Sequence, residues 1–310
     1  TLDALTSGDN NVAIGYQAGS TMNSGANNVL LGYQAGTVLT GSSNTFLGYK
    51  AGVASTSGLN NTVVGVEANG VGVMTGSSNV IMGADSAKNA TSLASCVIIG
   101  ASAVQTGVAT GANNVYIGAN AAKANTSGDG NIAIGKDAFI SNTTGAANIA
   151  IGLDALDGCD AETNNLAIGQ DSLGGSVAGG EYNIGIGNFT LDALTSADNN
   201  TAIGYNSGTA VTTGGQNTFV GSRTGVAVTD GDSNAFFGDL AGASVNSGGG
   251  NTLIGQVAGF DLTSGSNNIG LGKDSLRSGS PSGAISTGGN TICLGDNNIC
   301  LLYTSPSPRD

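Results

Sequence analysis

Three aspartates recur at intervals of 17 residues, and their spacing could support chemistry. Asp137, Asp154 and Asp171 each follow a Gly by two positions, in the segments Asp-Ala-Phe, Asp-Ala-Leu and Asp-Ser-Leu. If successive repeats stack as strands, these carboxylates would lie roughly 5 Å apart. Such a spacing suits a cation, or the carboxylate pair of a retaining glycosidase. We favour a plainer interpretation, in which each Asp caps a short turn, because nothing in the sequence identifies an acid–base partner.

Tyrosines form a second regular column. Tyr16, Tyr33 and Tyr49 each follow a Gly directly, and Tyr205 repeats the pattern later in the chain. Exposed rings in such a column could stack on sugars, whereas rings that stack on one another would form a structural ladder. We favour the ladder, since the spacing of the rings follows the repeat itself.

A short motif, Asn-x-x-x-Gly, sets the positions of both columns. It occurs sixteen times in steps of 16 to 18 residues, and Cys96 replaces the Asn in one copy. In a stack of identical repeats, Asn side chains in register would bond along the stack as a ladder. The predicted ladder residues are Asn11, Asn28, Asn44, Asn61, Asn79, Asn114, Asn131, Asn148, Asn165, Asn183, Asn200, Asn217, Asn234, Asn251 and Asn268.

The repeat predicts an all-β fold, a parallel β-solenoid (β-roll) of about 17 coils with a repeat of about 17 residues. Within the motif, the positions of Val12 and Ile14 are apolar in nearly every copy. They are two residues apart and share one face of a strand, so we assign them to the core. The position of Ala13 between them is also mostly apolar and would point to the opposite face. We therefore expect another surface to cover that face.

The repeat divides the chain into three parts. Residues 1–278 are predicted to form a continuous β-solenoid, and residues 279–299 an irregular insertion followed by a last coil. Residues 300–310 fit no repeat and resemble the translation of a sequencing adaptor, so we interpret them as an artefact. The chain starts on Thr1 instead of Met, and we interpret this start as a fragment boundary.

Composition narrows the function classes. The net charge of −13 disfavours binding to nucleic acid. The chain has no His, which excludes imidazole catalysis and His metal sites, and it has no apolar run near the roughly 20 residues of a membrane helix. Cys96, Cys159 and Cys293 match no zinc spacing and are predicted to be free thiols. We expect no enzyme activity, no cofactor, no resident metal and no membrane insertion.

The motif resembles that of two known groups of proteins. The segments Asn11–Gly19, Asn131–Ala138 and Asn200–Gly208 follow the pattern Asn-x-Ala-Ile-Gly-x-x-Ala/Ser. This pattern is similar to the repetitive shaft of bacteriophage tail fibres that end in a chaperone domain, and to the head repeats of trimeric autotransporter adhesins. The resemblance covers about residues 1 to 299 and implies a homotrimer of parallel β-solenoids.

These observations favour a structural or attachment protein, a fibre shaft or adhesin head that binds a host or cell surface. A fragment of a phage tail fibre is the preferred interpretation, located in the virion or on the extracellular cell surface, with a surface glycan or protein as its receptor. A bacterial surface adhesin is one alternative. A tailspike-type polysaccharide depolymerase that uses the stacked carboxylates is the other.

Overall fold

A computed structural model describes residues 1–278 and 285–296, and the segments 279–284 and 297–310 lie outside the described residues. The described part contains short strands and turns, and no helix in it is long and apolar enough to cross a membrane. Contacts group the chain into two compact units that divide between Asn199 and Asn200. Each unit is described separately below.

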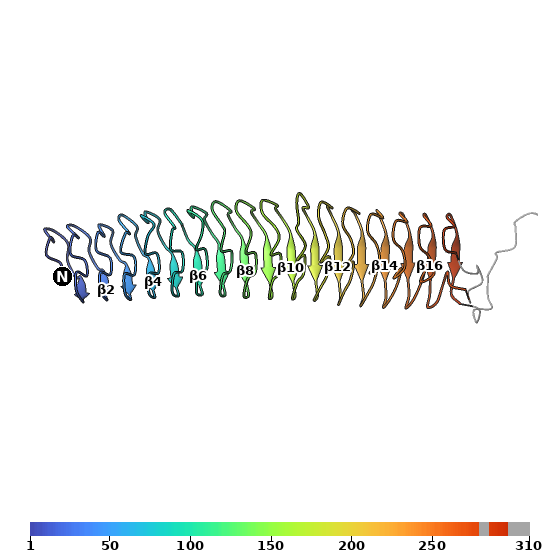
Figure 1. The fold of residues 1–310 in the computed structure, drawn as a ribbon, viewed down its shortest axis with the longest axis horizontal. Helices are drawn as coiled ribbons and strands as arrows, with labels where there is room; N and C mark the ends of the chain where they lie inside the picture. The colour runs from blue at the N-terminus through green and yellow to red at the C-terminus, as the bar shows by residue number, and fades with distance from the viewer. Residues whose placement is uncertain (279–284, 297–310) are drawn as a thin grey trace, which may run out of the picture. The chain divides into compact units, whose positions relative to one another are not determined.

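The first unit contains eleven strands of three residues each (Figure 1). They are β1 (Val12–Ile14), β2 (Val29–Leu31), β3 (Thr45–Leu47), β4 (Thr62–Val64), β5 (Val80–Met82), β6 (Val97–Ile99), β7 (Val115–Ile117), β8 (Ile132–Ile134), β9 (Ile149–Ile151), β10 (Leu166–Ile168) and β11 (Ile184–Ile186). Each strand pairs in parallel with the next along the chain, and equivalent residues are partners, as in Ala133 and Ala150.

The second unit contains β12 (Thr201–Ile203), β13 (Thr218–Val220), β14 (Ala235–Phe237), β15 (Thr252–Ile254), β16 (Ile269–Leu271) and β17 (Ile292–Leu294). These strands also pair in parallel and in register. The predicted all-β parallel β-solenoid is therefore confirmed, and the structure shows one short strand in each repeat. We number each coil by its strand, so that coil 9 contains β9.

The tail of the chain is described only in part. The predicted last coil includes β17, which pairs with β16. Most of the predicted insertion around Pro281 and all of the segment 300–310, which includes Cys300, lie outside the described residues.

The core lies on the opposite strand face from the one predicted. The middle residue of almost every strand is buried, as with Leu30, Phe46 and Ala150, whereas the flanking residues are exposed or half-buried. Val12 and Ile14, which the sequence pattern assigns to the core, are 49% and 59% exposed. Both strand faces are apolar, so a two-residue alternation could not show which one points inward.

A size relationship explains why the middle residue points inward. The side chain four positions after the motif Gly also points into the coil, and the two share one space. In coil 3, Phe46 faces Gly52, where an added Cβ would lie 2.6 Å from the Phe ring. In coil 9 the sizes are reversed, with Ala150 and Leu156 both fully buried. Large residues therefore alternate between the strand and the turn, and the narrow interior stays close-packed.

The middle residue also contacts the preceding coil. An added Cβ on Gly36 would lie 2.8 Å from Leu30 of its own coil and 3.0 Å from Phe46 of the next. A large middle residue thus favours a small turn residue both in its own coil and in the coil before it, although coil 6 accommodates Ile98 together with Val104. This rule accounts for Gly208, which follows the small Ala202 but precedes the coil of Phe219.

The turn after each strand relies on left-handed backbone conformations. In coil 8, Asp137 and Phe139 both have φ of 57°, and Ala147 before the next Asn has the same value. Equivalent positions in other coils are also left-handed, whichever side chain they carry. Tertiary packing therefore holds conformations that residues such as Phe and Leu rarely adopt.

Candidate functional site

The asparagine column forms a hydrogen-bonded ladder inside each unit. Asn234 is typical: its backbone N–H donates to Asn217 Oδ1 at 2.9 Å, and its Nδ2 donates to the carbonyl of Gly248 at 2.9 Å. Each side chain therefore joins the preceding coil to the following one. Because the ladder residues are buried, these bonds satisfy amide groups that would otherwise be costly to bury.

Cys96 interrupts this ladder in coil 6. Its backbone N–H still donates to Asn79 Oδ1 at 3.0 Å, but its side chain offers the next coil only a sulfur. Sγ donates to the carbonyls of Ala94 and Gly111, both at 3.4 Å, and burial raises the pKa of the thiol although its contacts with Asn114 and Ala94 oppose that rise. Sulfur is a weak acceptor, and the ladder is weaker at this step.

We expect Cys96→Asn to stabilise the first unit. The new Oδ1 would accept from the Asn114 amide, and Nδ2 would reach the carbonyl of Gly111, which now lies 3.4 Å from Cys96 Sγ. Two better hydrogen bonds are worth about 1–2 kcal/mol. Urea unfolding of the two proteins measures the gain. Cys96→Ser is the control, because its hydroxyl is too short to span both partners. A Cys96→Asn variant no more stable than this control would contradict the interpretation.

The structure places the three candidate aspartates on one column in adjacent coils. The N–H of Asp154 donates to the Lys136 carbonyl at 3.2 Å, and that of Asp171 to the Leu153 carbonyl at 3.0 Å. The side chains do not cap their turns as predicted. Asp137 bonds to Asn120 and Lys136, and Asp171 accepts from Gln170. Their left-handed backbone, which Asp tolerates, accounts for the column without a capping role.

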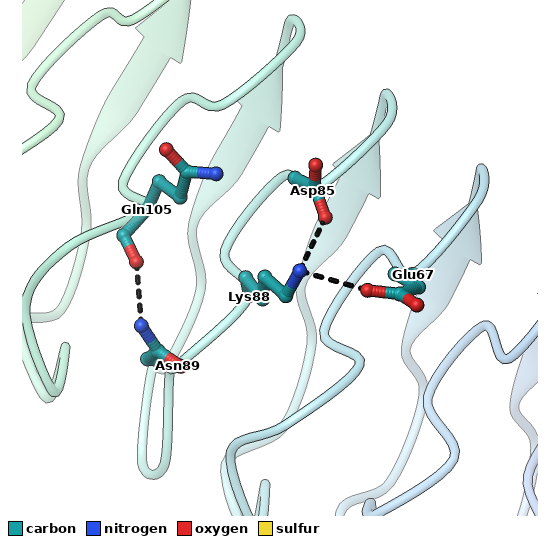
Figure 2. Close-up of polar contacts among 5 residues, drawn as sticks. All are labelled: Glu67, Asp85, Lys88, Asn89 and Gln105. Atoms are coloured by element: carbon teal, nitrogen blue, oxygen red, sulfur yellow. Dashed lines mark hydrogen bonds and ion pairs between the residues drawn. The ribbon is translucent and has the colours of Figure 1, made fainter.

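Elsewhere in this column, Asp85 and Asp274 each have a cation three residues later in the sequence. Figure 2 shows Lys88 between two neighbouring coils, with its Nζ 2.8 Å from Asp85 and 2.7 Å from Glu67. The bond to Asp85, followed by the bond to Glu67, raises the pKa of Lys88. Asn89, the next residue, donates to the carbonyl of Gln105 at 2.7 Å. Arg277 occupies the same place beside Asp274 in coil 16.

Coils 9 and 11 carry acids at the repeat position of those cations. Asp157 occupies the position of Lys88 within the repeat, and Asp192 occupies it two coils later. The sequence contains no Lys or Arg between Lys136 and Arg223. Burial, followed by repulsion from Asp154 and Asp171, raises the pKa of Asp157 to about 6. This acidic patch is the least compensated charge group that the described residues contain.

Asp157→Asn is expected to stabilise the chain at neutral pH but not at acid pH. The folded pKa lies above the unfolded one, so the native state binds the proton more tightly, and stability falls as pH rises from about 4 to 7. After allowance for partial solvent access, the gain at pH 7.5 is about 1 kcal/mol, and it vanishes near pH 4. Urea unfolding at both pH values measures it. Asp9→Asn, on an exposed loop, controls for the loss of one charge, and equal gains at both pH values would refute the prediction.

The tyrosine column is an aromatic ladder. The rings of Tyr16 and Tyr33 are stacked with centroids 5.3 Å apart, and those of Tyr33 and Tyr49 are stacked at 5.2 Å. Lys50 lies 5.3 Å from the Tyr49 centroid. Each stacked pair covers one ring face of each partner, and ring faces are the surfaces that would stack on sugars. The geometry therefore favours the structural interpretation for these three residues.

The most extensive surface feature is an apolar stripe on the outside of the strands. We define the outer stripe as the first and third residues of every strand. In the first unit it comprises two residues from each of eleven strands, or 22 residues, of which all but Thr45 and Thr62 are apolar. Ile14, Leu47 and Met82 are 59%, 42% and 39% exposed. In the second unit Ile254 is 43% exposed. Contiguous exposed apolar patches of this size are uncommon on monomeric soluble proteins.

Sequence reasoning missed this stripe because it assigned the same residues to the core. One available signal was the reciprocal size change between Phe46 and Gly52, and between Ala150 and Leu156, which shows which residues share a space. It also missed Glu162, whose buried carboxylate accepts from the amides of Asp160 and Gly179 at 2.9 and 2.8 Å. Burial acts to raise the pKa of Glu162, but these amide bonds outweigh it and the net shift is downward.

The cysteines do not form a reactive site. Cys96 and Cys159 are free and buried, which confirms the prediction of thiols at these positions, and Cys293 is also buried. Within residues 1–278 and 285–296, no group of three or more Cys, Asp or Glu side chains is arranged to hold a metal ion.

Comparison with known proteins adds no family assignment. No family model matches the sequence, and no curated protein is significantly similar to it.

Proposed function

We propose that this chain is a structural segment of an attachment fibre, of the kind found in phage tail fibres, and that it works as a homotrimer. The outer stripe carries this proposal. Its 22 residues in the first unit match the roughly 20–30 residues per side of a standard protein interface. The stripe presents one pair of mostly apolar residues per coil. A partner surface that matches this spacing over many coils must repeat at the same interval, as another copy of the same solenoid does.

The remaining surface is consistent with a scaffold. The side chains with the most regular geometry, the Asn ladder and the Tyr ladder, bond within the stack. The turns and return loops vary from coil to coil and would face outward from an assembled fibre. Repeated loops on three copies would bind a cell surface glycan or protein by many weak contacts, and avidity would supply the affinity.

Sedimentation of the full chain tests the assembly. We expect a trimer at micromolar concentration and a monomer for the triple variant Ile134→Lys, Ile151→Lys and Ile168→Lys. These three residues lie on the outer stripe, so the Lys chains reach solvent in a monomer, and far-ultraviolet circular dichroism should show an unchanged fold. A monomeric wild type, or a triple variant that stays trimeric, would overturn the proposal.

A matched control places the same charge off the stripe. Ser20→Lys, Ile140→Lys and Thr209→Lys lie at the repeat position that Lys88 and Lys123 occupy naturally, and the trimer should survive them. Attachment is tested by binding of the wild type and the stripe variant to a glycan array. Binding that is saturable for the trimer and at least 10²-fold weaker for the monomer supports the avidity mechanism.

A further inference from the structure

The interior of coils 7 and 8 contains polar side chains that are sealed from solvent. Tyr116, Asn125 and Asn142 are all 0% exposed. The Tyr116 hydroxyl, both amide atoms of Asn125 and the Oδ1 of Asn142 have no hydrogen-bond partner within the chain. These four atoms come from neighbouring coils, whereas most of the interior is apolar or bonded through the Asn ladder.

Tyr116 and Asn125 lie beside one ladder residue, Asn131, and Asn142 donates to the same Gly145 carbonyl as Asn131 does. A Cβ added to Gly128 would lie 2.7 Å from Asn125 Nδ2 and 2.9 Å from Asn131 Nδ2, so both amides lie beside the same point. The Tyr116 hydroxyl also lies near the Asn131 side chain, whose polarity opposes the rise that burial causes in the Tyr116 pKa. Asn142 is the equivalent of Asn125 in the next coil, seven residues after the motif Gly.

The same position is apolar in most other coils, and the buried Ser55 in coil 3 donates to Asn69 Oδ1 at 2.8 Å. Seven residues after the motif Gly, buried side chains at this place are Met22, Leu39, Leu194, Val211, Val228, Val245 and Leu262. A buried polar atom without a partner costs about 1–3 kcal/mol. Four such atoms would remove much of the 5–15 kcal/mol that holds a typical domain together. A hydrogen-bonding partner from outside the chain would remove this cost.

The unpartnered atoms comprise two donors and two acceptors, which match the hydrogen-bonding capacity of water. Tyr116 O–H and Asn125 Nδ2 are donors, while Asn125 Oδ1 and Asn142 Oδ1 are acceptors. One water accepts two hydrogen bonds and donates two, and buried waters typically make about three. We propose that coils 7 and 8 enclose an internal water site in which bound water bridges Tyr116, Asn125 and Asn142.

Oxygen-17 relaxation dispersion of water, together with a high-resolution crystal structure of the full chain, tests this site. Wild type should retain a long-lived internal water that the triple variant Tyr116→Phe, Asn125→Val and Asn142→Val loses. Valine at the Asn position has precedent in three coils, so the variant is expected to fold. Asn23→Val, on an exposed loop, is the control and should leave the dispersion amplitude unchanged.

Two results would overturn the proposal. One is electron density in which the Asn125 amide is turned over and Oδ1 accepts directly from Asn131 Nδ2, with no water beside it. The other is an equal dispersion amplitude in wild type and the triple variant. If the triple variant fails to fold, the single variant Asn142→Val and the wild-type electron density test the proposal instead. Asn142→Val removes one acceptor of the water and should therefore reduce the occupancy of the water.

Discussion

Gly152→Ala is expected to destabilise the first unit by about 4 kcal/mol or more, among the largest effects of a single substitution. Gly152 has φ of 144°, and a Cβ added there would lie 2.3 Å from the carbonyl oxygen of Gly169 in the next coil. The obstructing atom is backbone, so no side chain can move aside. Relief would require separating coils 9 and 10, which would break the strand pairing and the Asn ladder.

Thermal and urea unfolding measure this effect, and limited proteolysis shows where the stack opens. Coils contact mainly their neighbours, so cleavage should concentrate in the return loops of coils 9 and 10. Gly130→Asn is the matched control. Gly130 has φ of 66° with no atom within 4 Å of its added Cβ, and Asn113 and Asn164 occupy the same position in other coils. A Gly152→Ala variant as stable as this control would show that the coils are not packed as closely as described.

The second large effect is a compensated core exchange in coil 15. Gly259→Leu alone should cost about 3 kcal/mol or more, because an added Cβ lies 2.5 Å from Leu253 Cδ1 and the core is already filled. Leu253→Ala alone leaves a cavity and should cost about 2–5 kcal/mol. The double variant restores the arrangement of coil 16, where Gly270 faces Leu276, and should lie near wild type.

A double-mutant cycle by urea unfolding measures the coupling, which should be about 3 kcal/mol in favour of the pair. Coil 15 is suited to this exchange because Gly270 in the next coil leaves room for a leucine at position 259. Leu276, at the equivalent turn position, already adopts the required left-handed conformation with φ of 56°. Additive losses in the double variant would show that residues 253 and 259 do not share one space.

The corrected core changes the argument for assembly. In the predicted arrangement, Ala150 and its equivalents would form the outer face of the strands. That face would have one residue per strand, and in coils 8 to 11 these residues are small. The observed outer stripe instead presents Ile149, Ile151 and their equivalents, a larger and more uniform apolar surface. The expectation of a partner survives the correction, and its physical basis becomes stronger.

The amino-acid sequence by itself determined the repeat length, the parallel stack and the Asn ladder. These follow from Asn and Gly recurring at fixed positions, because in-register stacking is the arrangement that pairs each of them with its own copy. The free thiols followed from the separation of Cys96 and Cys159 along the same repeat.

Only the tertiary structure decided which strand face is the core. Phe46 and Leu47 are equally apolar, and the difference between them is that the turn at Gly52 leaves space for one of them. The charges also depend on contacts between coils. Lys88 pairs with Glu67 of the preceding coil, whereas Asp157 is repelled by Asp171 of the following coil. The sequence repeat determines which residues share a column along the stack. The space and the charges that neighbouring coils provide determine which column points inward and which column stays exposed to a partner.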